Sequence, residues 1–253
     1  MQISSNELVL RDVSIGYKFR RGKVKTVRTG LSVCLIPGQL TCLLGLNGAG
    51  KSTLLRTMCR FQDPLSGSVS LGNRNLNSFS ASELSSKVAV VLTERTSGSG
   101  LTVREVVSLG RYHYTGYFGT LTEGDERVID AALEAVGMEG YDSEYMSGLS
   151  DGERQKILIA KAVAQESPVI ILDEPTSFLD VSSRMEMFIL LRNLAHKRGK
   201  SILLSTHDVE LARRFADIWW LMGKDAFHVG TPDELIDSGT AAALFNRGDI
   251  RVF

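Results

Sequence analysis

The 253-residue sequence predicts an α/β fold in which a mostly helical block interrupts a parallel sheet. Short apolar runs typical of buried strands alternate with helical segments, and a glycine-rich loop stands between one such run and a helix. Between about residues 95 and 165, strand character gives way to helical spacing. The chain is 43% hydrophobic, which is enough for a core and excludes a disordered chain or a small disulfide scaffold. Its length predicts one domain, or one domain with a subdomain.

The first third of the chain predicts strands separated by turns. Residues 7–15 alternate apolar and polar positions, as a strand with one buried face does. A turn is expected at Gly38 and Gln39, and residues 40–45 then form a mostly apolar run that predicts a buried strand. Further elements are expected as a helix from residue 51 and strands at 67–71 and 87–92.

The rest of the chain predicts helices followed by parallel strands. Helical spacing at 102–110 and 122–136 marks the inserted block. Strand character returns at 169–173 and 201–205, with a helical segment at 185–198 between them. A strand–helix–strand order of this kind predicts parallel pairing of the two strands.

Charge and apolar patterning exclude several classes of protein. The 29 basic and 29 acidic residues cancel, which argues against a general nucleic-acid binder and against a polybasic lipid anchor. No apolar run approaches the roughly 18 residues of a membrane span, and residues 1–7 lack the pattern of a signal peptide. The three cysteines, Cys34, Cys42 and Cys59, form no C-x-x-C pair and are expected to pack as buried apolar residues in a reducing compartment. We therefore expect a soluble cytosolic chain.

Residues 45–52 fit the pattern G-x-x-x-x-G-K-[ST], between a predicted buried strand and a predicted helix. Its glycines let backbone N–H groups face phosphate oxygens, the helix N-terminus adds partial positive charge, and Lys51 adds a full charge. Ser52 can offer its hydroxyl to Mg²⁺, and Thr53 can support the α-phosphate. A plain glycine-rich turn does not account for the complete motif in this context. We predict a nucleoside triphosphate site made by Gly45, Asn47, Gly48, Ala49, Gly50, Lys51, Ser52 and Thr53.

Two adjacent carboxylates follow the apolar run at 169–172. They lie at the carboxyl end of a predicted strand, where such sheets bind ligands. Asp173 can hold Mg²⁺, and Glu174 can polarise a water against the γ-phosphate as a general base. The alternative is an ordinary acidic turn before Pro175. A phosphate loop in the same chain favours the Mg²⁺ and water-activating roles over this alternative.

A capping-box pattern, S-x-x-E, runs from Ser150 to Glu153 and predicts the start of a helix at 154–164. A capped helix N-terminus can bind an anion. By itself, however, this pattern favours an ordinary helix start over a ligand site.

In this context, Leu149-Ser150-Asp151-Gly152-Glu153 resembles the L-S-G-G-Q signature of ATP-binding cassette (ABC) proteins. The resemblance covers essentially the whole chain, because other family motifs follow in the family order. Tyr17 matches the aromatic residue that stacks on adenine, residues 177–180 look like the D-loop, and His207 matches the switch histidine.

The resemblance implies a P-loop NTPase (RecA-like) core with an N-terminal antiparallel β subdomain and an inserted helical signature subdomain. It also implies a homodimer in which two cassettes sandwich two ATP molecules head to tail. Ser150, Gly152 and Glu153 of one cassette would then complete the ATP site of the other. We expect a single ABC ATPase domain over 1–253, with a nucleotide-binding core at 1–94 and 166–253 and a helical subdomain at about 95–165.

Two positions depart from the family pattern. Asp151 stands where the signature has glycine, and since an acid suits a helix N-terminus we expect it to face away from phosphate and stabilise the helix start. Glu94 stands at the Q-loop position, where the family usually has glutamine, and places an acid near Mg²⁺ and the permease contact. Neither change removes the lysine, the two carboxylates or the histidine, so hydrolysis is expected to survive.

Three other patterns carry no function in this interpretation. Residues 246–249 resemble the guanine-reading N-K-x-D motif with arginine in place of lysine, and we interpret them as a turn. His113 has no further ligands at metal spacing and is expected at the surface. Residues 219–222 are expected to form a buried strand rather than a partner patch.

The chain has one cassette and no heptad run, which favours the motor subunit of an importer. Residues 102–112 resemble the entry to the helical subdomain in importers for iron–siderophore, haem and cobalamin, and the tail from residue 230 also looks like that group. The partners implied are permease subunits and a substrate-binding protein, with no nucleic acid, at the cytoplasmic face of the inner membrane as a peripheral subunit. The alternative is a free-standing soluble ABC ATPase acting in translation or DNA maintenance.

Overall fold

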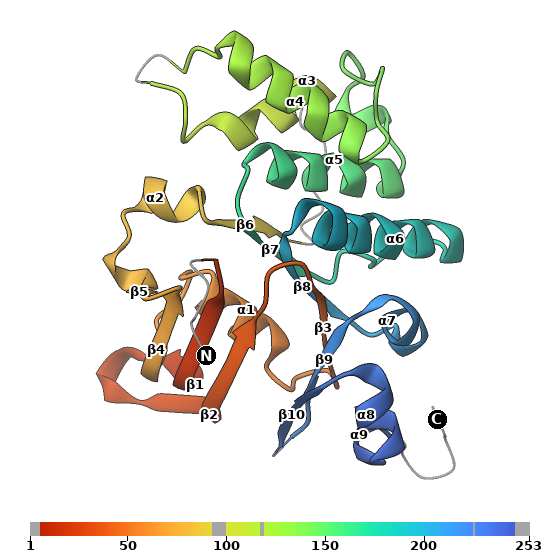
Figure 1. Cartoon of the computed structure of the whole chain (residues 1–253). Coiled ribbons are helices and arrows are strands. Elements are labelled where there is room, and N and C mark those ends of the chain that lie inside the picture. Colours follow the sequence, from red (N-terminus) through yellow and green to blue (C-terminus); the bar gives the residue numbers. More distant parts are fainter. Residues whose placement is uncertain (1–5, 93–99, 117–118, 225, 246–253) are drawn as a thin grey trace.

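The computed structural model describes residues 6–92, 100–116, 119–224 and 226–245 (Figure 1). Two sheets and a helical block make up this part of the chain. Within the described ranges, no helix is both long enough and apolar enough to cross a membrane.

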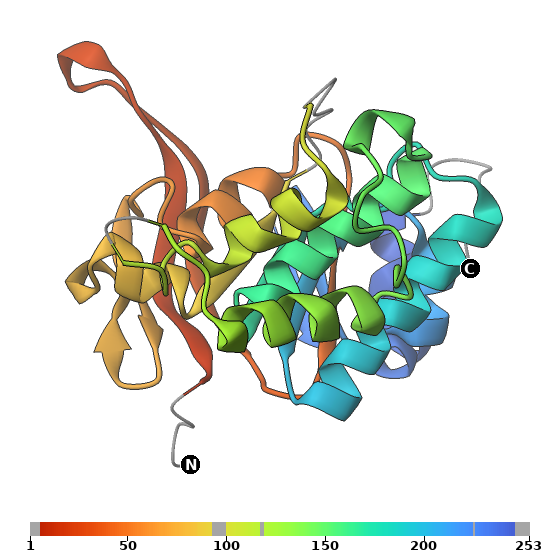
Figure 2. The same ribbon diagram turned by 90° about the horizontal axis from the view of Figure 1, so that it is seen from above.

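The smaller sheet is antiparallel, with the strand order β2-β1-β4-β5. Register shifts interrupt the pairing of β1 with β2, and the hairpin that joins the two strands projects from the body of the molecule (Figure 2). The buried side chains of β1 face the core, which confirms the half-exposed strand predicted at 7–15. The strands are β1 (Leu8–Lys18), β2 (Val24–Leu35), β4 (Ser66–Leu71) and β5 (Arg74–Asn75).

The larger sheet has six strands in the order β10-β9-β3-β8-β7-β6. All of its pairs are parallel except β10 with β9, which form an antiparallel edge. Because both faces of the sheet are covered, its central strands β3 and β8 are buried at every position. The strands are β3 (Leu40–Gly45), β6 (Val88–Val91), β7 (Val169–Asp173), β8 (Ser201–Thr206), β9 (Ile218–Met222) and β10 (Phe227–Gly230).

Alternate residues of the larger sheet contribute to two separate cores. Cys42 and Trp219 face the helices that cover one side, whereas Leu43 and Trp220 face the smaller sheet and the first helix. Cys42 and Cys59 are buried as predicted, but Cys34 is only half-buried because it lies on the partly exposed strand β2.

Helices flank the larger sheet along the chain. One of them, α6, begins at Val181, earlier than the predicted residue 185, because Asp180 Oδ1 accepts a hydrogen bond from Ser183 N at 2.9 Å and caps the helix. The flanking helices are α1 (Lys51–Met58), α2 (Ala81–Ser85), α6 (Val181–Arg198), α7 (Val209–Phe215), α8 (Pro232–Asp237) and α9 (Thr240–Phe245).

The inserted block contains α3 (Val103–Ser108), α4 (Glu123–Ala135) and α5 (Asp151–Ala164), which pack against one another. Each begins with a capping box, at Thr102, Thr122 and Ser150. Because Ser150 is the N-cap, α5 begins at Asp151, three residues before the predicted start.

Arginines hold the helical block together. Arg104 forms ion pairs with Glu126, Asp130 and Asp142, which lie on α4 and in the segment after it. Arg111 is buried and pairs with Asp125 at 2.9 Å. His113 departs in part from its expected surface position, since it is half-buried with its ring centroid 4.0 Å from that of Tyr114, whereas Tyr112 and Tyr114 on either side are exposed.

Candidate active site

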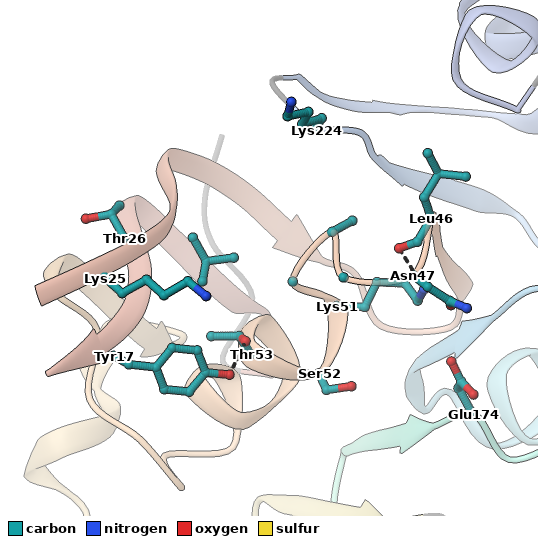
Figure 3. Close-up of a pocket in the computed structure, with 14 residues that line it drawn as sticks. Tyr17, Lys25, Thr26, Leu46, Asn47, Lys51, Ser52, Thr53, Glu174 and Lys224 are labelled. Atoms are coloured by element: carbon teal, nitrogen blue, oxygen red, sulfur yellow. Dashed lines mark hydrogen bonds between the residues drawn. The ribbon is translucent and has the colours of Figure 1, made fainter. Parts of the chain in front are cut away.

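A cavity of about 710 Å³ lies at the carboxyl end of β3, where the phosphate-loop residues meet the two sheets (Figure 3). β1 and β2 supply one wall, the loop after β3 and the start of α1 supply the floor, and one carboxylate lies at the far end. The lining residues are Tyr17, Lys25, Thr26, Val27, Leu46, Asn47, Gly48, Ala49, Gly50, Lys51, Ser52, Thr53, Glu174 and Lys224.

The loop between β3 and α1 needs glycine for two different reasons. Gly50 has a φ of 107°, and a Cβ at this position would lie 2.4 Å from Val27 Cγ1. Gly45 runs so close to β9 that a Cβ would lie 2.4 Å from the carbonyl oxygen of Met222. Side chains at either position would therefore displace the loop, which otherwise leaves the N-terminus of α1 open to an anion.

Lys51 lies at the base of this loop and is buried. Its Nζ donates to the carbonyl oxygen of Gly45 at 2.7 Å. Burial lowers the pKa of Lys51, and the nearby carboxylates of Glu174 and Asp173 oppose that shift. A cation in a partly desolvated loop interacts strongly with any anion that enters the cavity.

Tyr17 and Lys25 form the opposite end of the cavity. They are register partners across the β1–β2 hairpin, and the Lys25 side chain extends toward the phosphate loop (Figure 3). The hydroxyl groups of Tyr17 and Thr53 lie 2.8 Å apart and share a hydrogen bond. This bond fixes the tyrosine ring, which is 38% exposed and leaves a flat apolar face for a base.

Lys224 reaches the cavity from the turn between β9 and β10. The buried Arg28 donates to the carbonyl oxygens of Gly223 and Lys224, the second at 3.0 Å, and so ties this turn to β2. Sequence reasoning missed five lining residues: Lys25, Thr26, Val27, Leu46 and Lys224. Two of them had a signal in the sequence: Leu46 lies within the phosphate-loop motif, and Lys25 follows Tyr17 by eight residues across a hairpin.

Ser205 on β8 joins the two carboxylate residues that follow β7. Its Oγ donates to Asp173 Oδ1 at 2.6 Å and accepts a hydrogen bond from the backbone N–H of Glu174 at 2.9 Å. Since Ser205 is fully buried, it holds both residues in one orientation. The sequence did not indicate this residue.

Glu174 points toward the phosphate loop, with a φ of 50° that turns the chain out of the sheet. His207 Nε2 lies 2.5 Å from Glu174 Oε1, so the predicted base and the predicted switch histidine meet in the fold. A carboxylate hydrogen-bonded to a histidine at the edge of a phosphate site can orient and activate a water.

The oxygen groups present fit Mg²⁺. Ser52 offers a hydroxyl at the start of α1, and Asp173 offers a carboxylate at the end of β7. Within the described ranges, no group of three or more His, Cys, Asp and Glu side chains is arranged to hold a metal ion. Mg²⁺ at a nucleotide site is usually bound by only one or two protein oxygens together with phosphate. Glu94, the third predicted ligand, lies outside the described residues.

The predicted signature residues do not line this cavity. Ser150 and Glu153 bond each other in the capping box, and this hydrogen bonding lowers the pKa of Glu153. Gly152 lies beside α6, since a Cβ on it would be 3.4 Å from Ser183 Oγ. Within one chain, this helix start is therefore not part of the cavity at the phosphate loop.

Asp151 occupies the first position of α5 and pairs with Arg154 at 2.9 Å, with 62% of its side chain exposed. Asp151→Gly is therefore expected to lower the free energy of unfolding by at most ~1 kcal/mol and to change ATP turnover little. Denaturant unfolding and steady-state ATPase assays measure both effects. Asp151→Asn is the matched control that removes only the charge. A large gain in ATPase rate for Asp151→Gly would contradict the outward orientation.

Comparisons with known proteins give a consistent result. A family model described as ABC transporter matches residues 29–177. An iron(3+)-hydroxamate import ATP-binding protein of Bacillus subtilis is 35% identical over 237 residues, which cover 91% of this chain and 86% of the relative.

Solved structures extend the similarity to the fold. A metal-chelate type ABC transporter in an inward-facing conformation matches with a TM-score of 0.80 at 27% identity, over 94% of this chain and 88% of that one. A bacterial ABC transporter cassette solved as a dimer matches with a TM-score of 0.74 at 26% identity, over 89% of this chain and 98% of the other. The predicted α/β core with an antiparallel β subdomain and inserted helices is thereby confirmed.

Proposed function

The chain belongs to the ABC transporter family as an ATP-binding subunit with ATPase activity, and from this premise we propose that it powers import of a metal chelate of the iron–siderophore, haem or cobalamin class. The similarity to an iron(3+)-hydroxamate import protein and to a metal-chelate type transporter supports this substrate class. One observation carries the catalytic part: a single cavity holds the phosphate loop at its floor and Glu174, bonded to His207, at its end.

In the proposed site, ATP lies with its base against Tyr17 and its phosphates on the loop at residues 45–53. Lys51 binds the β- and γ-phosphates, and Glu174 orients the attacking water while His207 holds the Glu174 carboxylate. Ser52 and Asp173 are the ligands for Mg²⁺, with Glu94 as a further candidate. When bound, Mg²⁺ neutralises phosphate charge that develops during transfer.

ABC cassettes form dimers, and import ATP-binding subunits pair with membrane permeases. For this chain we propose a head-to-tail homodimer in which Ser150, Gly152 and Glu153 of one copy complete the ATP site of the other. The whole chain acts as one cassette, with a core at 1–94 and 166–253 and a helical subdomain at 95–165. It sits at the cytoplasmic face of the inner membrane against its permease, which receives substrate from a binding protein.

Coupling to a permease is the test that separates this proposal from a free-standing ATPase. We expect ATPase activity to rise when the protein is reconstituted with its permease in lipid. Glu94→Ala should lower this stimulated rate more than the basal rate, because the Q-loop position joins the catalytic core to the partner surface. The measurement is steady-state ATPase with and without the permease.

Glu94→Gln is the control, since it restores the residue usual in the family and should be tolerated. Equal proportional losses in both conditions for Glu94→Ala would make Glu94 a local catalytic residue. No stimulation of the unmutated protein by any permease would favour the free-standing alternative.

A further inference from the structure

The zero net charge of the chain conceals two segments of opposite charge. Residues 13–62 contain no acidic residue, and five of the eight residues at 18–25 are Lys or Arg. Residues 128–153 contain seven acidic residues and no basic one. Such separation within one chain creates fields that can steer association with a partner of complementary shape and charge.

The basic segment is the tip of the hairpin between β1 and β2, here called the basic hairpin (residues 18–25). It projects from the body of the molecule (Figure 2), and Lys18, Arg20 and Lys23 are exposed. None of these three side chains forms an ion pair with another described residue. Phe19, beside them, is 51% exposed. All of the described side chains in the basic hairpin are exposed, so they contribute nothing to the buried core of their own chain.

The acidic segment includes an exposed turn at residues 139–145, here called the acidic turn, which lies shortly before α5, the helix that begins at the signature-like residues. Glu139 and Glu144 are exposed and form no ion pair among the described residues, whereas Asp142 is held by Arg104. Tyr145 adds an aromatic ring that is 56% exposed. The acidic turn thus presents carboxylates and an exposed aromatic ring, just as the basic hairpin presents cations and the exposed ring of Phe19.

The basic hairpin and the acidic turn cannot meet within one chain. They lie at opposite ends of the molecule (Figure 1), yet on the same side of it (Figure 2). In a two-fold dimer the same surface of both copies is used, so that an element at one end meets the complementary element at the other end, twice.

We propose that the basic hairpin of one copy docks on the acidic turn of a second copy and closes the rim of the ATP-bound dimer. This inference depends on the proposed head-to-tail dimer, and it adds a contact specific to this chain. Both elements would lie close to the proposed shared ATP site. Tyr17 and Lys25 at the base of the hairpin line the cavity. The acidic turn lies a few residues before α5, whose start would complete the ATP site of the other copy.

Charge-reversal variants in a homodimer provide a direct test, because a chain that carries both reversals is complementary to itself again. On the Glu174→Gln background, the three variants are Arg20→Glu with Lys23→Glu, Glu139→Lys with Glu144→Lys, and all four together. Sedimentation at several salt concentrations measures the ATP-dependent dimer dissociation constant. Each double reversal is expected to weaken the dimer roughly tenfold to a hundredfold at low salt, and the fourfold variant is expected to recover most of the loss.

Two controls separate the contact from general effects. Lys197→Glu with Arg198→Glu makes the same change in net charge as the hairpin reversal, but at an exposed site at the end of α6. It should leave the dimer dissociation constant unchanged. Binding of a fluorescent ATP analogue to the monomer should also match that of the Glu174→Gln parent in all variants, since none of the charge-reversed residues lines the cavity.

Three results would overturn the inference. If the Glu174→Gln parent stays monomeric with ATP and Mg²⁺, the result would contradict the proposed head-to-tail dimer itself. If the parent dimerises but the charge reversals have no effect, or are not rescued in the fourfold variant, the result would contradict only the hairpin contact. Loss of binding to phosphatidylglycerol vesicles by Arg20→Glu with Lys23→Glu, at an unchanged dimer constant, would assign the hairpin to a lipid surface instead.

Discussion

Replacing Glu174 with glutamine is expected to lower ATP turnover at least ~100-fold and to leave an ATP-bound dimer that persists during size-exclusion chromatography. Glutamine keeps the size of the side chain but cannot accept a proton from water. The backbone of Glu174 should keep its position because its N–H donates to Ser205 Oγ, which the substitution does not touch. ATP can then still bind and join two chains while the step that would release them is blocked.

The measurement compares elution volumes with ATP and Mg²⁺, with ADP and without nucleotide. Glu210→Gln, the same chemical change at an exposed position on α7, should remain monomeric under all three conditions and hydrolyse ATP normally. A Glu174→Gln protein that stays monomeric at high concentration with ATP would count against the sandwich. A variant that keeps most of its turnover would exclude Glu174 as the base.

Replacing Lys51 with methionine is expected to raise the dissociation constant for ATP by about 100-fold and to abolish hydrolysis. Methionine has a similar length but no charge, so the phosphates lose a charge-assisted hydrogen bond in a partly desolvated loop. Folding should not suffer, because burial lowers the pKa of Lys51 and the folded chain therefore holds this charge less readily than the unfolded chain does.

Titration with a fluorescent ATP analogue gives the affinity, and a thermal unfolding curve separates lost binding from lost structure. Lys197→Met, at an exposed position of α6, is the matched control and should change neither. Affinity within a few-fold of the parent protein would show that the loop backbone and helix N-terminus supply nearly all of the phosphate binding. Unfolding at a much lower temperature would instead assign Lys51 a mainly structural role through its bond to Gly45.

The strands, helix starts and phosphate loop could be predicted because their determinants are local. The run at 40–45 is mostly apolar since both faces of β3 are covered. The glycines at 45 and 50 are recognisable from the loop motif, and in the fold a Cβ would lie 2.4 Å from the Met222 carbonyl oxygen at Gly45 and 2.4 Å from the Val27 side chain at Gly50. A capping box needs only two residues three positions apart, so Ser150 and Glu153 could be identified without any tertiary information.

The grouping of the candidate catalytic residues could be predicted only in part. Asp173 and Glu174 were recognisable because a carboxylate at the end of an apolar strand lies at the ligand-binding edge of a parallel sheet. Ser205, which orients both, was not recognisable, since a serine in a buried strand has no distinguishing pattern and lies 32 residues further along the chain. Its role depends on β7 and β8 being neighbours, which is a property of the sheet order.

The sequence by itself indicated the candidate groups of this protein: a phosphate loop, paired carboxylates, a proposed switch histidine and a signature-like segment, each recognisable over a few adjacent residues. The tertiary structure decided which of them share a cavity. It brings His207 to Glu174 and Lys224 to the phosphate loop, and it leaves the signature helix outside the same cavity. The physical reason is that sheet order and hairpin closure set distances between residues far apart in the chain, and no local pattern of charge or hydrophobicity records those distances.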